Sequence, residues 1–233
     1  VVQKQFSTIT FVKGDVAILT EAAGLVNAAL PRRCIFAGMG DRAFYGGGYN
    51  GRYVNLNNVK NIMNNTQTGG WDNTWNAPHN ICIPFYVSTN GYGVLFDDHY
   101  RGASFTPSSQ GTTYETYSPT PIAYYFVGGD GSLASVLENY TFLTGRQELP
   151  PYWALGYLTS RYGYHSADEA ADVIAKIKAV GLPLDALVFD LYWQGAAPDG
   201  MGNLNWYAPN FPEPTKMLAD FAAQDVKTIC ITE

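Results

Sequence analysis

Charged side chains, cysteine and long apolar runs are all scarce in this sequence. Charged residues make up 15% of the 233 residues, against about a quarter in an ordinary soluble domain. The formal net charge is −6, so the chain lacks the basic surface that binds nucleic acid. No stretch approaches the roughly 20 apolar residues of a membrane-spanning helix. We therefore expect neither nucleic acid nor a membrane as a partner.

The three cysteines, Cys34, Cys82 and Cys230, are far apart and odd in number. This spacing predicts neither a disulfide framework nor a metal-binding motif, so we expect buried free thiols. The three histidines show no paired spacing, and no Gly-x-Ser-x-Gly turn is found in the sequence. We expect no metal and no cofactor.

Aromatic residues and glycine take the place of the missing charges, with 17 Tyr, 12 Phe, 5 Trp and 24 Gly. A surface that is polar and aromatic more than ionic suits neutral, hydroxyl-rich ligands. The stretch VVQKQFSTIT at the start alternates like a strand and lacks the pattern of a signal peptide, so we interpret the chain as mature or trimmed. The low charge favours an extracytoplasmic location, periplasmic or secreted.

Residues 1–147 have the pattern of an antiparallel β-sandwich. FSTITFVKGDVAIL alternates around a turn at residues 13–15, and ICIPFYVSTNGYGVLFDD reads as a hairpin around Asn90-Gly91. TTYETYSPTPIAYYFVGG adds two strands, and residues 131–145 predict a helix that ends at Gly145.

Residues 148–233 predict strand, helix, strand, helix, strand. The stretch YWALGYLTS is a short apolar strand, and the helix after it is capped by Ser166 with Glu169 and stopped by Gly181. Its predicted apolar stripe consists of Val173, Ile174, Ile177 and Val180. LDALVFD and VKTICIT are the next two strands, with the helix EPTKMLADFAAQD between them. This alternation predicts parallel strands covered by helices. Because three strands cannot close a barrel and the sequence stops after the third, we interpret the chain as a fragment.

Asp190 ends the second of these strands, where burying an unpaired carboxylate is costly. In α/β barrels the reactive groups lie at the carboxyl ends of the strands, and Arg161 and Glu233 follow the other two strands. The alternative is that Asp190 caps its loop or pairs with Arg161, and position alone does not separate these interpretations.

Aromatic residues are concentrated in the loops at the same strand ends. A sugar ring favours aromatic walls together with acids that accept hydrogen bonds from its hydroxyls. The alternative to sugar binding is that these aromatics pack within their loops, which is the common outcome for any single aromatic. The five residues concerned are Tyr162, Tyr164, Tyr192, Trp193 and Trp206.

Two features of the first half remain to be assigned. FYGGGYNG, residues 44–51, lacks the ending of a phosphate-binding loop, so we expect a tight turn with close backbone approach. Residues 57–80 form a long polar stretch that contains Trp71, and either a ligand-facing lid or a surface excursion is consistent with it.

The stretch PPYWALGYLTSRYGYHSADEAADVIAKIKAVGLPLDALVFD closely resembles the start of the catalytic barrel in glycoside hydrolase family 31. FYGGG resembles a Phe-Tyr-Gly motif of the domain that precedes this barrel. The resemblance implies a galactose-mutarotase-like β-sandwich over 1–147 and, over 148–233, the first three strands and two helices of a (β/α)8 TIM barrel. DLYWQG and the sequence from residue 201 onward look more like the oligosaccharide 4-α-glucosyltransferase branch than the common α-glucosidases.

By this resemblance, Asp190 matches the acid that hydrogen-bonds the sugar in the −1 subsite. Retaining enzymes use two carboxyls roughly 5 Å apart, and in this family both come from later strands, so we expect residues 1–233 alone to be inactive. We expect no catalytic residue in this chain, and the remainder of the barrel is an expected partner. The substrate-binding residues that we predict are Asp190, Trp193, Tyr192, Arg161, Tyr162, Trp71 and Glu233.

Three functions therefore stay open at this point. The first is an α-glucosidase or 4-α-glucosyltransferase acting on an oligosaccharide substrate, an α-glucan or maltooligosaccharide, when intact. The second is a non-catalytic carbohydrate-binding module, and the third is a structural domain without a ligand.

Overall fold

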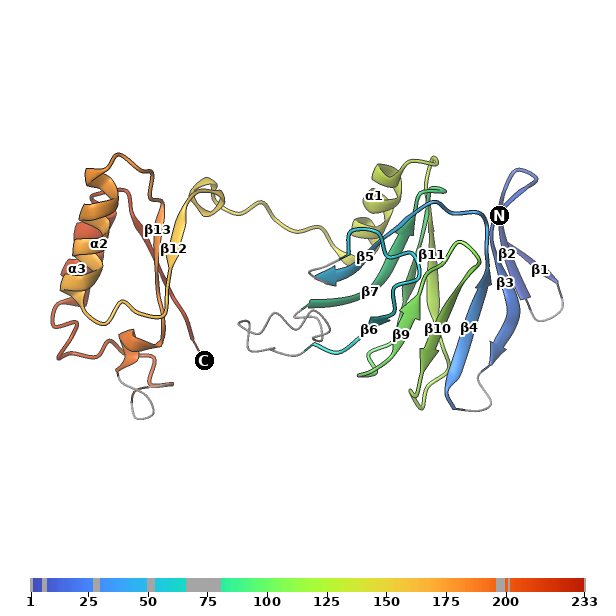
Figure 1. Cartoon of the computed structure of the whole chain (residues 1–233), viewed down its shortest axis with the longest axis horizontal. Helices are drawn as coiled ribbons and strands as arrows, with labels where there is room; N and C mark the ends of the chain where they lie inside the picture. The colour runs from blue at the N-terminus through green and yellow to red at the C-terminus, as the bar shows by residue number, and fades with distance from the viewer. Residues whose placement is uncertain are drawn as a thin grey trace. The chain divides into compact units, whose positions relative to one another are not determined.

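The computed structural model describes residues 2–5, 8–26, 30–49, 53–65, 81–195, 200 and 202–232. The chain divides into two compact units, Val1–Arg146 and Gln147–Glu233 (Figure 1). The boundary expected from the sequence lies between residues 147 and 148.

The first unit contains two antiparallel sheets. The larger one has the order β1-β2-β3-β4-β10-β9-β6, and the smaller one has the order β11-β8-β7-β5. The strands of the larger sheet are β1 Val2–Gln5, β2 Thr8–Lys13, β3 Val16–Val26, β4 Arg32–Ala37, β10 Gly111–Thr116, β9 Ser104–Thr106 and β6 Asn61–Ile62. Those of the smaller sheet are β11 Tyr124–Gly128, β8 Tyr92–Phe96, β7 Ile81–Ser88 and β5 Phe44–Tyr49.

Aromatic side chains from both sheets meet in one core. The Phe96 ring of the smaller sheet stacks on the Tyr114 ring of the larger sheet, with centroids 4.0 Å apart. Phe36 and Phe105, both fully buried, belong to the same cluster. The two sheets therefore pack face to face as a sandwich. The prediction of buried thiols holds for Cys34, whereas Cys82 and Cys230 are only half-buried.

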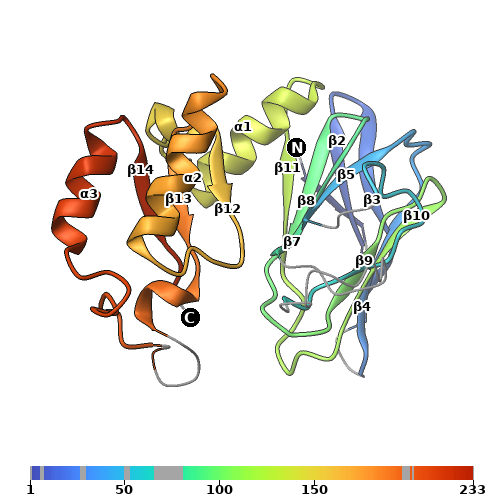
Figure 2. The same cartoon turned by 60° about the vertical axis from the view of Figure 1, so that its left-hand side comes forward.

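The predicted hairpins and the first helix are confirmed. Ser88 pairs with Tyr92 across the Asn90-Gly91 turn. Helix α1, Leu133–Thr144, begins after Ser132, whose side chain accepts a hydrogen bond from the Ser135 N–H. It packs against β7, β8 and β11 on the outer face of the smaller sheet (Figure 2).

The Gly-rich stretch is a strand, so the prediction of a tight turn there was wrong. Residues 44–49 form β5, whose pairing with β7 shifts register between Gly46 and Gly48. Gly48 has φ +87°, and a Cβ on it would lie 2.2 Å from the Ile81 carbonyl oxygen. The predicted close approach of two backbones is therefore present, but it lies inside a bulged strand.

The second unit is a three-stranded parallel sheet in the order β12-β13-β14. Helices α2 and α3 lie on one side of it in both views (Figures 1 and 2). Ile174 of α2, Phe221 of α3 and Leu187 of β13 share one buried cluster. The elements are the 3-10 helix η1 Tyr152–Leu155, β12 Leu158–Ser160, α2 Ala167–Ala179, β13 Ala186–Phe189, the 3-10 helix η2 Leu191–Gln194, α3 Pro214–Ala222 and β14 Lys227–Cys230.

Two local predictions for this unit need correction. The first part of YWALGYLTS is η1, so the strand begins only at Leu158. Val180, predicted on the apolar stripe of α2, is 70% exposed, and Ala170 takes its place among the buried residues. Val180 is the C-cap residue of the helix, where the chain has already left the face that meets the sheet.

Candidate functional site

Asp190 follows the middle strand of the parallel sheet, directly after β13. Its backbone N–H donates to the Gly163 carbonyl at 3.1 Å, which links the loop after β12 to the loop after β13. Its carboxylate oxygen Oδ1 accepts from the Leu191 N–H at 2.7 Å and so caps η2. The half-buried side chain forms no ion pair within the described residues. One oxygen therefore has a structural role, and the capping interpretation holds for that oxygen.

Arg161 does not pair with Asp190. Its guanidinium forms an ion pair with Glu169 of α2 and lies over the Tyr164 ring, 5.1 Å from the ring centroid. The guanidinium is thus directed to the helix. Asp190 was expected either to cap its loop or to pair with Arg161, and the structure shows the loop cap. That Arg161 binds substrate stays a prediction, although its charge is already matched by a carboxylate.

Tyr162 and Tyr192 form an edge-to-face pair next to Asp190, with ring centroids 5.1 Å apart. The His165 ring lies 3.7 Å from the Tyr192 ring on another side. A side-chain hydrogen bond with Tyr162, together with burial and the negative charge of Asp190, raises the pKa of Tyr192. The Tyr192 phenol therefore stays neutral at physiological pH and is able to donate or accept hydrogen bonds.

The other predicted aromatics pack inward. Trp193 is 6% exposed, and its indole N–H donates to the Ile231 carbonyl at 2.9 Å. Trp206 packs edge-on against Trp193 at 5.2 Å, and Tyr164 is 1% exposed. Because these three rings pack against other side chains, Tyr162 and Tyr192 form the aromatic surface beside Asp190. The structure therefore gives Trp193 a bracing contact between two strand ends.

Gln194 supports the loop after η2, a feature that our sequence reasoning missed. Its side chain is 2% exposed, and Oε1 accepts from the Gly202 N–H at 2.8 Å and the Leu204 N–H at 3.2 Å. Nε2 has no partner within the described part of the chain. No sequence signal distinguishes this glutamine from one on the surface, since its role depends on backbone groups eight and ten residues away.

Trp71 and Glu233, both predicted to bind substrate, lie outside the described residues. The same holds for most of the long polar stretch, of which residues 57–65 are described.

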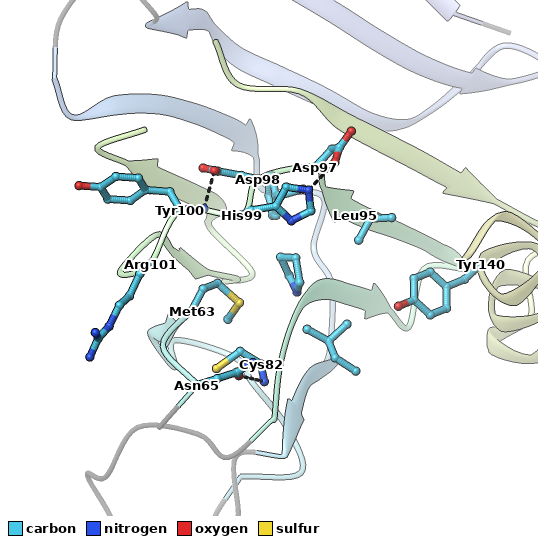
Figure 3. Close-up of a pocket in the computed structure, with 13 residues that line it drawn as sticks. Met63, Asn65, Cys82, Leu95, Asp97, Asp98, His99, Tyr100, Arg101 and Tyr140 are labelled. Carbon is cyan, nitrogen blue, oxygen red and sulfur yellow. Dashed lines mark hydrogen bonds and ion pairs between the residues drawn. The ribbon is translucent and has the colours of Figure 1, made fainter. Parts of the chain in front are cut away.

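A separate cavity of about 560 Å³ lies on the sandwich (Figure 3). Ile83 and Leu95 contribute apolar surface from β7 and β8, and Tyr140 of α1 lies at one end. Polar groups come from the segment after β8, where the Asp97 side chain is 47% exposed and lies 4.0 Å from His99. The cavity thus combines apolar surface with an exposed carboxylate.

Two further features are absent from the described ranges. These residues contain no group of three or more His, Cys, Asp or Glu side chains arranged to hold a metal ion. Within them, no helix has the length and apolar character needed to cross a bilayer.

Comparison with known proteins assigns the second unit to a protein family. Residues 147–233 match the family model described as the TIM-barrel domain of glycosyl hydrolases family 31. An α-glucosidase from Saccharolobus solfataricus is 27% identical over 214 residues, which cover 90% of this chain and 29% of that protein. An α-xylosidase from Lactiplantibacillus pentosus is 30% identical over 195 residues, covering 82% of this chain and 24% of that protein.

A solved structure extends the match to both units. The family 31 dextranase of Flavobacterium johnsoniae, complexed with glucose, aligns with a TM-score of 0.84 at 24% identity. The alignment covers 100% of this chain and 30% of that one. At this identity the match shows the fold. The chain spans less than a third of the length of these relatives.

A sandwich followed by parallel strands is thus the fold that this chain shares with a solved family 31 structure. The chain belongs to glycoside hydrolase family 31. Its relatives in this family are α-glucosidases, α-xylosidases and glucosyltransferases.

Proposed function

We propose that this chain contributes the sugar-binding start of a retaining α-glycosidase or α-glucosyltransferase that acts on α-1,4-linked gluco-oligosaccharides. In this proposal β12, β13 and β14 are the first three strands of a (β/α)8 barrel. The observation that carries it is Asp190, a half-buried carboxylate at the end of the middle strand that no cation neutralises within the described residues. The position is the one where barrel enzymes hold their substrates.

Asp190 has the capacity to hold a sugar hydroxyl. An ionised carboxylate offers about four lone-pair sites, and the Leu191 N–H uses one of them. Sugar hydroxyls that donate to the remaining sites form charge-assisted hydrogen bonds, which are about twice as strong as neutral ones. Tyr162 and Tyr192 supply an adjacent aromatic edge for the apolar face of the ring.

Bond cleavage needs groups that we place outside residues 1–233. Retention requires one carboxyl as nucleophile and a second, roughly 5 Å away, as acid and then base. The family resemblance assigns both to later strands, and the chain spans less than a third of its relatives. We expect residues 1–233 alone to bind sugar weakly and to leave glycosidic bonds intact.

The test is steady-state kinetics of the full-length protein with p-nitrophenyl α-glucoside and with maltotriose. We expect Asp190→Ala to lower kcat/KM by roughly 1000-fold, since two charged hydrogen bonds at about 2 kcal/mol each are lost. The matched control is Asp185→Ala at the opposite end of β13, where the carboxylate accepts from the Tyr157 N–H at 2.8 Å. Equal effects of the two variants on kcat/KM of the folded protein would remove Asp190 from the site.

Hydrolysis and transfer are distinguished by the products. Relatives of both kinds exist, an α-glucosidase and a 1,6-α-glucosyltransferase among them. We favour transfer to a sugar acceptor, because DLYWQG and the sequence from residue 201 resemble the transferase branch. Each transfer then converts two maltotriose molecules into one longer and one shorter oligosaccharide, whereas glucose and maltose without any longer product would favour a hydrolase.

A second candidate function is carbohydrate binding by the sandwich itself. The cavity in Figure 3 favours it, because apolar surface from Ile83 and Leu95 adjoins the exposed Asp97 carboxylate. Affinity electrophoresis of the full-length protein in soluble starch and in dextran tests this function. Retardation that Asp97→Ala abolishes and Asp190→Ala preserves supports binding by the sandwich, and the reverse pattern contradicts it.

A further inference from the structure

Glu169 ties together both ends of the loop that follows β12. At one end of the loop, its oxygen Oε1 forms the ion pair with the Arg161 guanidinium. At the other end, its oxygen Oε2 accepts from the His165 backbone N–H at 2.6 Å. The Glu169 N–H in turn donates to Ser166 Oγ at 3.1 Å, which fixes the residue in the first turn of α2. One carboxylate thus holds loop 161–165 closed against the helix.

The same loop makes the contacts that position the proposed sugar site. The Gly163 carbonyl accepts from the Asp190 backbone N–H at 3.1 Å. The Tyr162 and His165 rings contact the Tyr192 ring, with centroid distances of 5.1 Å and 3.7 Å. A shift of loop 161–165 therefore displaces Asp190 and Tyr192 together.

The energetics separate this role from ordinary stabilisation. The Arg161 and Glu169 side chains are 53% and 26% exposed, and exposed ion pairs contribute about 0–1 kcal/mol to folding. A misplacement of about 1 Å at a reacting centre, in contrast, costs on the order of 100-fold in rate. Loss of Glu169 is thus a small change for the fold and a large one for the site.

We propose that Glu169 is a positioning residue, which holds loop 161–165 so that Asp190 and the Tyr162–Tyr192 pair meet the sugar. Arg161 is its partner in this role through the ion pair. The inference rests on the proposed function and deepens it, since it explains how a loop at a strand end keeps one conformation.

The experiment measures kcat/KM of the full-length protein with p-nitrophenyl α-glucoside, alongside the melting temperature. We expect Glu169→Ala to lower kcat/KM by about 10- to 100-fold. Glu169→Gln keeps an oxygen for the His165 N–H but loses the ion pair with Arg161, so we expect it to recover part of the activity. The matched control is Asp172→Asn, which breaks the exposed Asp172–Lys176 pair on the same helix and leaves kcat/KM unchanged.

A double-mutant cycle identifies the route of the effect. If Glu169 acts through Asp190, Glu169→Ala costs less than threefold in a protein that already carries Asp190→Ala. A full additional loss in that background, or wild-type activity of Glu169→Ala alone, overturns the positioning role. Wild-type activity of Asp190→Ala alone overturns the proposed function instead, so the two failures are distinguishable.

Discussion

The acids inside the sandwich and the acid at the end of β13 are held in opposite ways. Glu21 is 3% exposed, and both its oxygens are used, one by the Tyr124 hydroxyl at 2.7 Å and one by the Ile9 N–H at 2.9 Å. Asp98 likewise accepts from the Tyr114 hydroxyl at 2.6 Å and the Tyr100 N–H at 2.9 Å. At Asp190, the Leu191 N–H is the hydrogen-bond donor recorded within the described residues.

This difference teaches how to distinguish a structural carboxylate from one available to a ligand. Buried acids are tolerated when hydrogen-bond donors saturate them, because an unpaired buried charge costs several kcal/mol. Glu21 meets that condition with groups from two other strands, and Asp98 with the Tyr114 hydroxyl of β10 and the Tyr100 N–H of its own segment. Asp190 is half-buried with one donor from its own neighbour, so its remaining capacity is open to sugar hydroxyls.

Among the variants that test this difference between the acids, we expect the largest effect from Asp190→Asn. The amide keeps an oxygen for the Leu191 N–H but loses the charge and half of the acceptor capacity. We expect kcat/KM of the full-length protein to fall by roughly 100- to 1000-fold, or about 3–4 kcal/mol. The melting temperature should move by less than about 2 °C. A large drop in melting temperature with normal kinetics would place Asp190 with the sandwich acids.

The matched change in the sandwich is Glu21→Gln, with the opposite outcome. The amide nitrogen then faces either the Tyr124 hydroxyl or the Ile9 N–H and leaves a buried donor unpaired. We expect a loss of about 2 kcal/mol in the free energy of unfolding, and kinetics of the folded protein that are unchanged. Urea denaturation measures this loss. Glu115→Gln is the control, since its pair with Arg33 is exposed and contributes less than about 1 kcal/mol.

Two helix caps allow a finer comparison. Ser166 caps α2 and Ser132 caps α1 through equivalent bonds to the N–H three residues on. Alanine at either position should cost about 1 kcal/mol of stability in its own unit, measured by hydrogen exchange of that helix. Only Ser166→Ala should also weaken maltose binding in calorimetry, because Glu169 braces the site from the same turn. Equal maltose affinity in both variants would contradict the link.

The smallest effect concerns acid stability. Burial alone raises the pKa of Asp98, but hydrogen bonds from Thr116, Tyr114 and the Tyr100 N–H outweigh it and lower that pKa below its ordinary value. A carboxyl with a lowered folded pKa stabilises the fold above its unfolded pKa, near 4. This contribution is lost as the pH falls through the folded value. The melting temperatures of wild type and Asp98→Asn should therefore converge with falling pH, and a gap that stays constant would contradict the assignment.

Elements with a local signal were predictable from the sequence. Ser166 with Glu169, the Asn90-Gly91 turn and Gly145 each fix their neighbours through bonds or dihedral angles within a few residues. The position of Asp190 after a parallel strand was predictable for the same reason, since it follows from strand order.

Features that depend on distant partners could not be predicted from the sequence. Nothing local shows that Arg161 turns to Glu169, or that Trp193 donates its N–H to Ile231, 38 residues away. The triple glycine had a local signal for positive φ, but a turn and a bulged strand share that signal. Five aromatics follow the strand ends in the sequence, but packing turns Trp193, Trp206 and Tyr164 inward and leaves the pair Tyr162–Tyr192 beside Asp190.

The contact between Trp193 and Trp206 has a consequence for how this protein can be observed. Two indoles whose ring centroids lie 5.2 Å apart couple their electronic transitions, and that coupling vanishes when either ring swings away. Near-ultraviolet circular dichroism and fluorescence should then show, without any added dye, whether Trp193 and Trp206 are in contact after β13. Trp206→Phe, which lacks the indole pair, supplies the control spectrum. The difference between the two spectra then reports on the conformation of the loop next to Asp190.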